Sequence, residues 1–332
     1  MVLKLHSFTI VAVLAVSIGT SSSSMADEPK PRVLMLTQSK GFVHQPVKRL
    51  EGELAPAEVA MRQLALETGK FTLELSQDAA TAITRENLQN YDVVLFYTSG
   101  DLPITDDAMN YFSNEWLKQA KHGLIGVHSA SDTLKKDPRY FEYIGGSFVG
   151  HPWTQNTTVN IAVHEPTHPT VAAFGERIVL QEEIYQYSNW APQNVRILMS
   201  LDMSKCNPKR PSHVPVAWVK SWGEGRMFYN NLGHRPDTWQ NKQFLQSMLA
   251  GIQWVAGLTD GPTAPNPELS AQQELLAKKA ATDAGVTEES LKAEAAAKAE
   301  AAAKNKARTE AKPKTPPPLP PQIPFNIPVP VK

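Results

Sequence analysis

The segment Gly123-Leu124-Ile125-Gly126-Val127-His128-Ser129-Ala130-Ser131-Asp132-Thr133 decides the fold that we expect. Its first five residues are apolar or glycine and suit a buried parallel strand. The strand gives way at once to a polar run that begins at His128, and Gly126 allows close backbone approach just before it. Several α/β folds present a reactive side chain on a sharp turn after a central strand. We therefore predict an α/β domain with His128 at its functional centre.

The rest of the domain alternates between strand-like and helix-like segments. Before His128, short apolar runs predict strands at residues 33–36, 71–75 and 92–97, and periodic patterns predict helices at 58–67 and 106–120. The short connections imply a mostly parallel sheet flanked by helices. The second half is richer in strands, with a hairpin formed by the last two and a final helix at 241–255; these strands are expected at 157–163, 177–180, 196–201, 214–219 and 225–229.

Both ends of the chain differ in composition from the expected domain, which spans residues 27–258. Lys4, a short apolar run and the small residues up to Ala26 predict a signal peptide over residues 1–26, because the run is too short to cross a bilayer. The protein is therefore expected to be exported, to the periplasm or beyond. The composition of residues 259–311 predicts a partly helical Ala/Lys/Glu-rich linker that packs on nothing. Residues 312–332 are predicted to form a disordered Pro-rich tail, which is either solvated or bound to an envelope partner.

Charge and composition exclude several classes of function. Lys+Arg and Asp+Glu both number 33, so no basic surface favours nucleic acid or an anionic membrane. No later segment is long and apolar enough for a transmembrane span. The sequence contains no phosphate-binding glycine loop of the P-loop or dinucleotide type, and we predict no nucleotide cofactor. Cys206 is the single cysteine, which rules out an intrachain disulfide, and its loop contains no activating base.

Histidines follow several strands at the edge where α/β sheets bind their ligands. His44 follows the first strand, His128 the fourth, and His234 the last. Ser129 and Asp132 follow the fourth strand with His128. Each histidine alone fits a hydrogen-bonded structural role, but three at one edge favour a shared polar site. Histidine suits a general base, a proton donor or a metal ligand.

The middle of the chain adds further candidates. His151 ends a glycine-rich loop, and His168 lies in the proline-containing segment 165–169. Glu183 lies two residues before Tyr185. A glutamate near histidines suits acid/base chemistry or a divalent metal ion. None of the spacings is diagnostic of a metal site, so the metal remains open.

Two tryptophans near these loops are candidates for lining a pocket. Trp153 lies two residues after His151, and Trp239 lies in the loop after His234. Exposed aromatic faces can stack on sugar rings, although ordinary packing is the common role of tryptophan. Trp218, inside an apolar strand, is assigned to the core.

A set of ordered motifs resembles the ThuA-like (trehalose-utilisation) family. The motifs cover nearly all of residues 32–256, and their order is more specific than any one of them. They are Lys40-Gly41-Phe42-Val43-His44, Gly123 to Thr133 as quoted above, Gly145-Gly146-Ser147-Phe148, His151-Pro152, His168-Pro169, Glu182-Glu183-Ile184-Tyr185, Pro215-Val216-Ala217-Trp218, Gly225-Arg226-Met227-Phe228-Tyr229 and Leu232-Gly233-His234.

The resemblance implies a class I glutamine amidotransferase-like, flavodoxin-like fold. In that fold the turn residue is a nucleophilic cysteine, whereas here it is His128 and Cys206 lies elsewhere. Glutamine hydrolysis by that route is therefore not expected. Because family members are associated with sugar catabolism, the resemblance implies an enzyme acting on a small carbohydrate, oxidised or keto-sugars included: a hydrolase, lyase or isomerase.

We assign catalytic roles to His128, His234 and Glu183. Substrate-binding roles are expected for the remaining candidates, which are His44, Ser129, Asp132, His151, Trp153, His168, Tyr185 and Trp239. A divalent metal ion is a possible cofactor. The alternatives are a non-catalytic carbohydrate-binding module, tethered by the linker, and a metal-binding protein.

Overall fold

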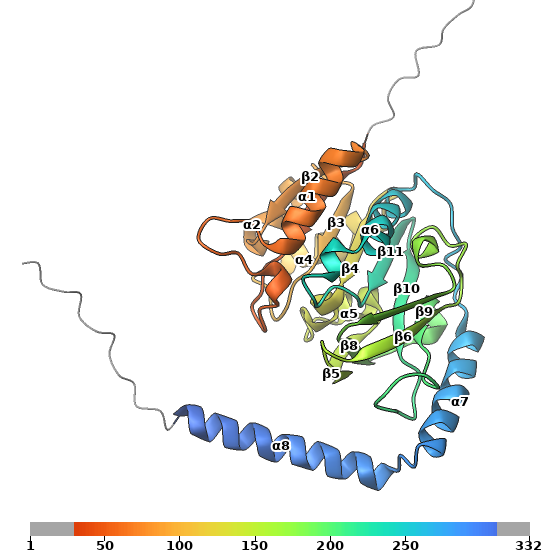
Figure 1. The fold of residues 1–332 in the computed structure, drawn as a ribbon. Coiled ribbons are helices and arrows are strands. Elements are labelled where there is room, and N and C mark those ends of the chain that lie inside the picture. The colour runs from red at the N-terminus through yellow and green to blue at the C-terminus, as the bar shows by residue number, and fades with distance from the viewer. Residues whose placement is uncertain (1–29, 311–332) are drawn as a thin grey trace, which may run out of the picture. The chain divides into compact units, whose positions relative to one another are not determined.

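The structure is a computed structural model that describes residues 30–310. The expected signal peptide and Pro-rich tail lie outside the described residues. The main sheet has nine strands in the order β2-β1-β3-β4-β11-β10-β9-β6-β7 (Figure 1). The bounds are β1 Arg32–Leu36, β2 Thr72–Ser76, β3 Val93–Phe96, β4 Gly123–Val127, β6 Thr158–Val163, β7 Arg177–Gln181, β9 Arg196–Leu201, β10 Pro215–Trp222 and β11 Gly225–Asn230.

The sheet divides into a parallel half and an antiparallel half. Strands β2, β1, β3, β4 and β11 run parallel, so their carboxyl ends meet at one edge. From β11 onward the neighbours pair antiparallel, beginning with the predicted hairpin of β10 and β11. The expectation of an α/β fold with a strand-rich second half is confirmed, and the complete sheet is mixed.

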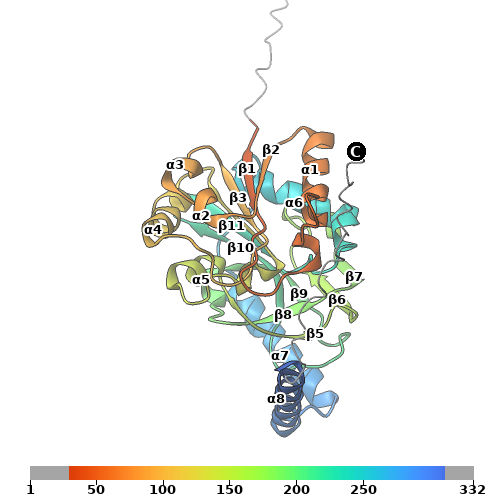
Figure 2. The same cartoon turned by 90° about the vertical axis from the view of Figure 1, so that its left-hand side faces the viewer.

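Helices cover both faces of the sheet and create two cores. Helices α1 (Pro56–Thr68) and α6 (Lys242–Val255) pack on one face. The other face carries α2 (Ala79–Ala82), α3 (Arg85–Leu88), α4 (Asp106–Asn114) and α5 (Pro138–Ile144) (Figure 2). Alternate side chains of β1 supply both cores, as the two-residue period of a strand requires: Val33 faces α1 and α6, and Leu34 faces the others.

Two segments differ locally from the expectation. The helix expected to reach residue 120 ends at Asn114, followed by a 3₁₀ turn at Trp116–Lys118. Trp116 is buried there and its indole N–H donates to the Leu88 carbonyl, which turns the chain inward. The glycine-rich loop at 145–153 is largely a strand, β5 (Ser147–Trp153), which pairs antiparallel with β8 (Ile184–Ser188) in a separate two-stranded sheet.

The Ala-rich region after residue 259 forms two helices, α7 (Pro267–Asp283) and α8 (Glu288–Glu310). The prediction that this region packs on nothing is wrong: α7 contacts β9 and buries Ala277 and Ala281, and Glu294 of α8 pairs with Arg210. Because the alanine side chain is small, a helix can bury a face of alanines without showing a marked apolar stripe in its sequence. Within residues 30–310, none of the helices is long and apolar enough to span a bilayer.

Candidate functional site

The turn after β4 is strained in the way that the sequence predicts. His128 has a φ of 45°, in the left-handed region that a residue with a side chain seldom adopts. A short 3₁₀ helix, His128–Asp132, begins at once and redirects the chain. Glycine is needed at position 126, because a Cβ there would lie 2.6 Å from Ile144 Cδ1 and 2.9 Å from Tyr229 Cδ2. Backbone strain of this kind concentrates at functional sites.

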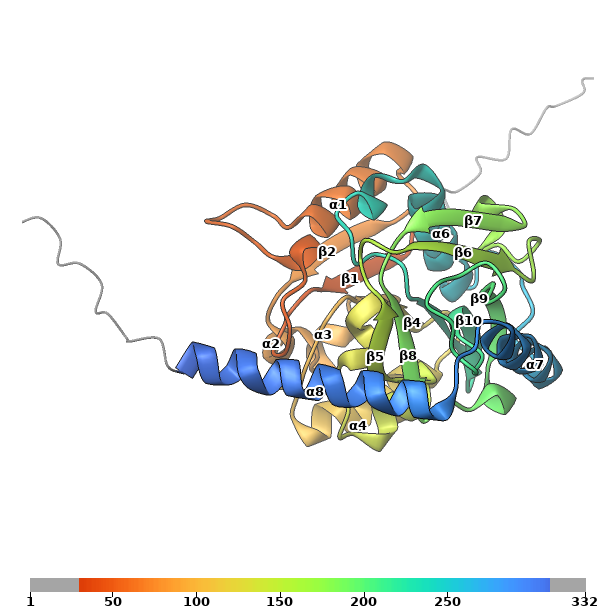
Figure 3. The same cartoon turned by 60° about the horizontal axis from the view of Figure 1, so that its bottom comes forward.

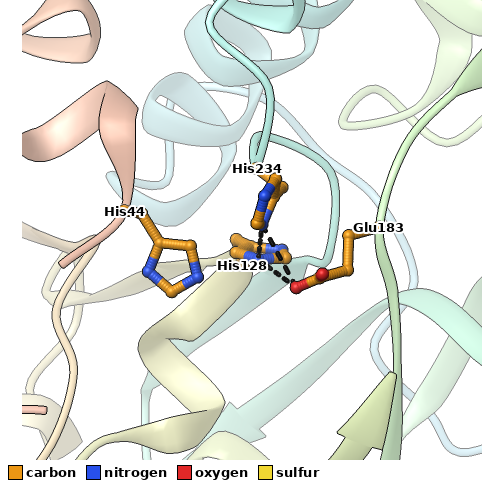
Figure 4. A group of neighbouring side chains, drawn as sticks. All are labelled: His44, His128, Glu183 and His234. Atoms are coloured by element: carbon orange, nitrogen blue, oxygen red, sulfur yellow. Dashed lines mark hydrogen bonds and ion pairs between the residues drawn. The ribbon is translucent and has the colours of Figure 1, made fainter. Parts of the chain in front are cut away.

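Four side chains converge at the carboxyl edge of the parallel strands. They are His44 after β1, His128 after β4, His234 after β11 and Glu183 at the start of β8 (Figure 4). Each offers a nitrogen or oxygen atom, and these atoms all lie within 4.8 Å of one another. We call these four residues the His/Glu cluster. The strand-end rule thus located three of its members, and only the fourth enters from the small β5–β8 sheet.

Three of the four atoms form a compact triangle. His234 Nδ1 lies 3.2 Å from His128 Nε2 and 3.1 Å from Glu183 Oε1. The third side, from His128 Nε2 to Glu183 Oε1, is 3.6 Å. A tetrahedral zinc ion with bonds of roughly 2.0–2.2 Å separates its ligand atoms by roughly 3.3–3.6 Å. The triangle therefore has the dimensions of three ligands around one such ion.

The orientation of His128 is fixed from behind. Its Nδ1 lies 2.7 Å from the backbone carbonyl oxygen of Asn231, which can only accept a hydrogen bond, so Nδ1 carries the proton. In the neutral ring the lone pair is then on Nε2, which faces His234 and Glu183. Metal-bound histidines are held in the same manner, with the second nitrogen donating to a carbonyl or carboxylate. The ring is completely buried.

His44 is held as a neutral imidazole beside the triangle. Burial, followed by the neighbouring His128 and His234, lowers the pKa of His44 to about 2. Its Nε2 lies 3.2 Å from the hydroxyl of Tyr185, and burial raises the pKa of that hydroxyl, which keeps its proton. The ring centroids of His44 and His128 are 4.9 Å apart. The His44 ring therefore stays uncharged, with one of its two nitrogens free of a proton and able to offer an electron pair.

Glu183 supplies the negative charge of the cluster. Burial raises the pKa of Glu183, but hydrogen bonds to His128 and His234 outweigh it and hold the pKa well below its usual range. Its second oxygen, Oε2, lies 3.2 Å from Nδ1 of His151. The His151 side chain is 46% exposed, so it is the histidine around Glu183 that meets solvent directly. The cluster consequently has a buried interior and one open side.

Asn231 links the segments that carry the cluster, and the sequence analysis missed it. The side chain is completely buried. Its Oδ1 accepts hydrogen bonds from the Tyr185 N–H and the Tyr187 hydroxyl, and its Nδ2 donates to the Glu183 carbonyl. The backbone carbonyl of Asn231 also accepts the hydrogen bond from His128 Nδ1. Asn231 therefore orients both the turn after β4 and the start of β8. The only signal in the sequence is a pair of asparagines directly after a buried strand.

Glu182 is a second supporting residue that received no role from the sequence. Its buried carboxylate accepts hydrogen bonds from the Gly233 N–H at 3.0 Å and the Thr238 hydroxyl at 2.7 Å. Burial raises its pKa. Because Gly233 immediately precedes His234, Glu182 fixes the loop that presents the His234 side chain to the cluster.

The structure corrects the roles expected for the two tryptophans. Trp153 is fully buried in the core and presents no face to a ligand. Trp239 is also buried, stacks on Tyr97 and donates its indole N–H to the Gly233 carbonyl. Trp239 therefore supports the His234 loop from inside instead of lining a pocket. Trp218 is in the core, as predicted.

Ser129 and Asp132, which were expected to bind substrate, belong to the turn after β4 and are not members of the His/Glu cluster. Ser129 is buried, and its carbonyl accepts a hydrogen bond from the Thr133 hydroxyl. Asp132 pairs with Lys135 at 3.0 Å on the surface. Tyr185, by contrast, is buried directly beside the cluster, with its ring centroid 4.3 Å from that of His128, and its substrate-binding role stays a prediction. Cys206 is buried with its thiol near the Asn160 carbonyl, consistent with a structural role.

His168 does not join the cluster. Its Nδ1 lies 2.9 Å from the Thr170 hydroxyl, and its ring packs edge-on against Trp254 with centroids 5.4 Å apart. Burial lowers the pKa of His168 to about 4, so it is neutral near pH 7. The expected substrate contact is therefore wrong, since the side chain is part of the packing beneath the end of α6.

Replacement of His168 should lower the stability of the fold without affecting metal binding or turnover. We expect His168→Leu to cost about 1–3 kcal/mol of unfolding free energy through the lost hydrogen bond and altered packing. Metal content and turnover should remain at wild-type values, because no atom of the cluster touches this ring. Urea denaturation and elemental analysis of the same preparation measure both quantities. A large loss of bound metal would show that His168 acts on the site after all.

The parallel strands and the strained turn at their carboxyl edge define an α/β protein with a mixed sheet flanked by helices. A family model described as trehalose utilisation, ThuA, matches residues 32–255. The chain therefore belongs to the ThuA family, and His128 stands at its strand-end turn. No curated protein matches the sequence.

Two solved structures of ThuA-like proteins are similar in fold. A putative ThuA-like protein from Bacteroides uniformis is 20% identical, with a TM-score of 0.56 over 70% of this chain and 94% of that chain. A putative ThuA-like protein from Parabacteroides merdae is 15% identical, with a TM-score of 0.54 over 72% of this chain and 98% of that chain. At these identities the likeness concerns the fold alone.

Proposed function

We propose that this chain is an exported, metal-dependent enzyme that acts on a small carbohydrate, with the His/Glu cluster as its metal site. The observation that carries the proposal is the convergence of four potential ligand atoms within 4.8 Å. Three imidazoles and one carboxylate are a ligand set typical of zinc and related divalent ions. The export part of the proposal rests on the signal-like residues 1–26.

Hydrogen-bond accounting supports a cation at the centre. The Nε2 lone pair of His128 and the charged Glu183 oxygen both face Nδ1 of His234. A neutral His234 can supply at most one proton there, so two acceptors compete for one donor. A cation satisfies all three atoms at once. The buried negative charge of Glu183 also favours this arrangement, since buried charges are stable only when paired or bound to metal.

The carbohydrate part of the proposal is supported by the family description, trehalose utilisation, and by the residues around the cluster. The buried Tyr185 ring and the half-buried Phe148 ring lie beside the cluster, inclined at 48° with centroids 4.2 Å apart. Aromatic rings beside polar groups suit a sugar, which has both apolar C–H faces and hydroxyls. A divalent ion polarises a carbonyl or hydroxyl oxygen, which favours hydrolysis or proton abstraction next to a keto group.

The remaining roles in the proposed reaction, holding the metal ion and transferring protons, are assigned to side chains of this protein. His128 is buried and its Nδ1 is held by Asn231, so it serves as a fixed ligand. His151 is the half-exposed group beside Glu183 and is our candidate for moving protons to and from a substrate. From the sequence, His128 was expected to be either the acid/base or a ligand, and His151 a binding residue; this proposal takes the ligand role for His128 and revises the role of His151.

Elemental analysis of the purified full chain tests the metal. We expect about one divalent ion per chain after loading and dialysis. A chelator should remove it and lower the melting temperature, and re-addition should restore both, because a ligand of the folded state stabilises it by mass action. Absence of stoichiometric metal after loading contradicts the proposal. Metal binding without turnover of any sugar in an oxidised and unmodified disaccharide panel would favour a non-catalytic binding protein instead.

A further inference from the structure

A cavity of about 740 Å³ opens beside the His/Glu cluster, between β5, the loop around Arg210 and the helix α8. Its lining includes Phe148, His151, Gln186, Arg210, Glu294 and Ala295. In Figure 3, α8 runs past the β5–β8 pair, and residues of both elements line this cavity. We infer that the cavity is an outer subsite, walled by α8, that takes the second sugar unit of a neutral disaccharide. The inference rests on the proposed carbohydrate function.

The cavity adjoins the cluster through two side chains. His151 lines the cavity and its Nδ1 lies 3.2 Å from Glu183 Oε2. Phe148 lines the cavity and its ring lies against Tyr185, whose hydroxyl reaches His44. A substrate with one ring at the cluster therefore extends past His151 and Phe148 directly into the cavity.

The charges of the cavity favour an uncharged ligand. Arg210 is only 9% exposed, and its Nη2 lies 2.9 and 3.0 Å from the two carboxylate oxygens of Glu294. The same carboxylate pairs with Lys298 at 2.8 Å. Glu294 thus pairs with both cationic side chains of the cavity wall, so neither Arg210 nor Lys298 presents an unpaired charge to an anionic ligand. What remains for recognition is hydroxyl and amide chemistry beside the Phe148 ring, which suits a sugar.

The size of the cavity agrees with this assignment. Pockets for small ligands span roughly 300–1,000 Å³, and the cavity volume of about 740 Å³ falls within that range. The ion pair between Arg210 and Glu294 ties α8 to the loop that forms the opposite wall. The C-terminal region therefore takes part in substrate binding in this proposal, beyond the role of a spacer.

Filling the cavity from α8 tests the inference. Ala295→Trp places a large ring in the cavity, and Ala293→Trp is the matched control, because two residues earlier lies about 200° around the helix. Binding of trehalose, sucrose, cellobiose and glucose to the zinc-loaded full chain is measured by titration calorimetry. We expect the tightest disaccharide to bind at least tenfold more weakly to Ala295→Trp, with glucose unchanged and Ala293→Trp equal to wild type.

The outcomes separate the two proposals. Equal disaccharide affinity in wild type and Ala295→Trp overturns the subsite and leaves the proposed function standing. Failure of the wild-type zinc-loaded protein to bind any of the four sugars overturns the carbohydrate function and the subsite with it. An equal loss in Ala293→Trp also overturns the subsite, because the effect would then not depend on the cavity. Unchanged melting temperatures of both variants establish that they fold.

Discussion

His128→Ala protein is expected to bind zinc at least about a hundredfold more weakly than wild type, and to lose turnover by about a thousandfold. Its Nε2 forms two sides of the ligand triangle, 3.2 Å from His234 and 3.6 Å from Glu183. Removing an outer-shell partner of a metal ligand typically costs 10–100-fold in affinity, and removing a ligand itself costs more. Loss of a charge-stabilising group at a reacting centre costs on the order of 10²–10³ in rate.

Two measurements make this prediction specific. Competition with a chelating dye gives the zinc affinity, and the disaccharide panel gives the turnover. His168→Leu is the matched control, since it removes an equally buried histidine that touches Thr170 and Trp254 instead of the cluster. Unchanged zinc affinity in His128→Ala, with the control behaving as expected, would exclude His128 as a ligand.

The α/β fold was predictable because its central strands are buried on both faces. β1, β3 and β4 therefore read as short, continuous apolar runs in the sequence. β5 and β8 carry no such signal, because they pair only with each other in a two-stranded sheet and β5 contains mixed exposed and buried positions. The helix α7 was misjudged because alanine buries too little surface to mark an apolar stripe.

The candidate site was predictable in part, through the rule that parallel strands share a carboxyl edge. This rule placed His44, His128 and His234 together. The capacity of this cluster to hold a metal ion was not predictable from spacing, because each of its four side chains comes from a different segment. The roles of Asn231 and Glu182 depend on contacts with backbone groups of distant segments, which leave no trace in the local pattern.

The error at Trp153 has a specific structural cause. His151 and Trp153 are two residues apart on β5 and would share one face of a regular strand. The β5–β8 pairing shifts register between Gly150 and Trp153, as at a β-bulge. The His151 side chain is consequently exposed toward the cavity, while Trp153 turns into the core. Nearness in sequence to a predicted site residue therefore does not show where a side chain points.

Asn231→Ala is expected to lower both the stability of the fold and its affinity for zinc. The variant leaves two buried groups without this partner, the Glu183 carbonyl and the Tyr185 N–H, while the Tyr187 hydroxyl keeps its hydrogen bond to the Tyr229 hydroxyl. An orphaned buried group costs about 1–3 kcal/mol, so a loss of about 2 kcal/mol or more in unfolding free energy is expected. The affinity for zinc should fall by about 10–100-fold, as for other changes behind metal ligands.

Asn230→Ala is the natural control for this prediction. Asn230 is equally buried, but its Oδ1 accepts only from the Leu232 N–H and reaches no segment that carries Glu183. Urea unfolding of the metal-free proteins should show a loss in both variants, larger in Asn231→Ala. Zinc affinity should fall in Asn231→Ala alone, because only this residue connects the turn at His128 with the start of β8. Wild-type zinc affinity in Asn231→Ala would mean that the residue stabilises the fold without orienting the ligands.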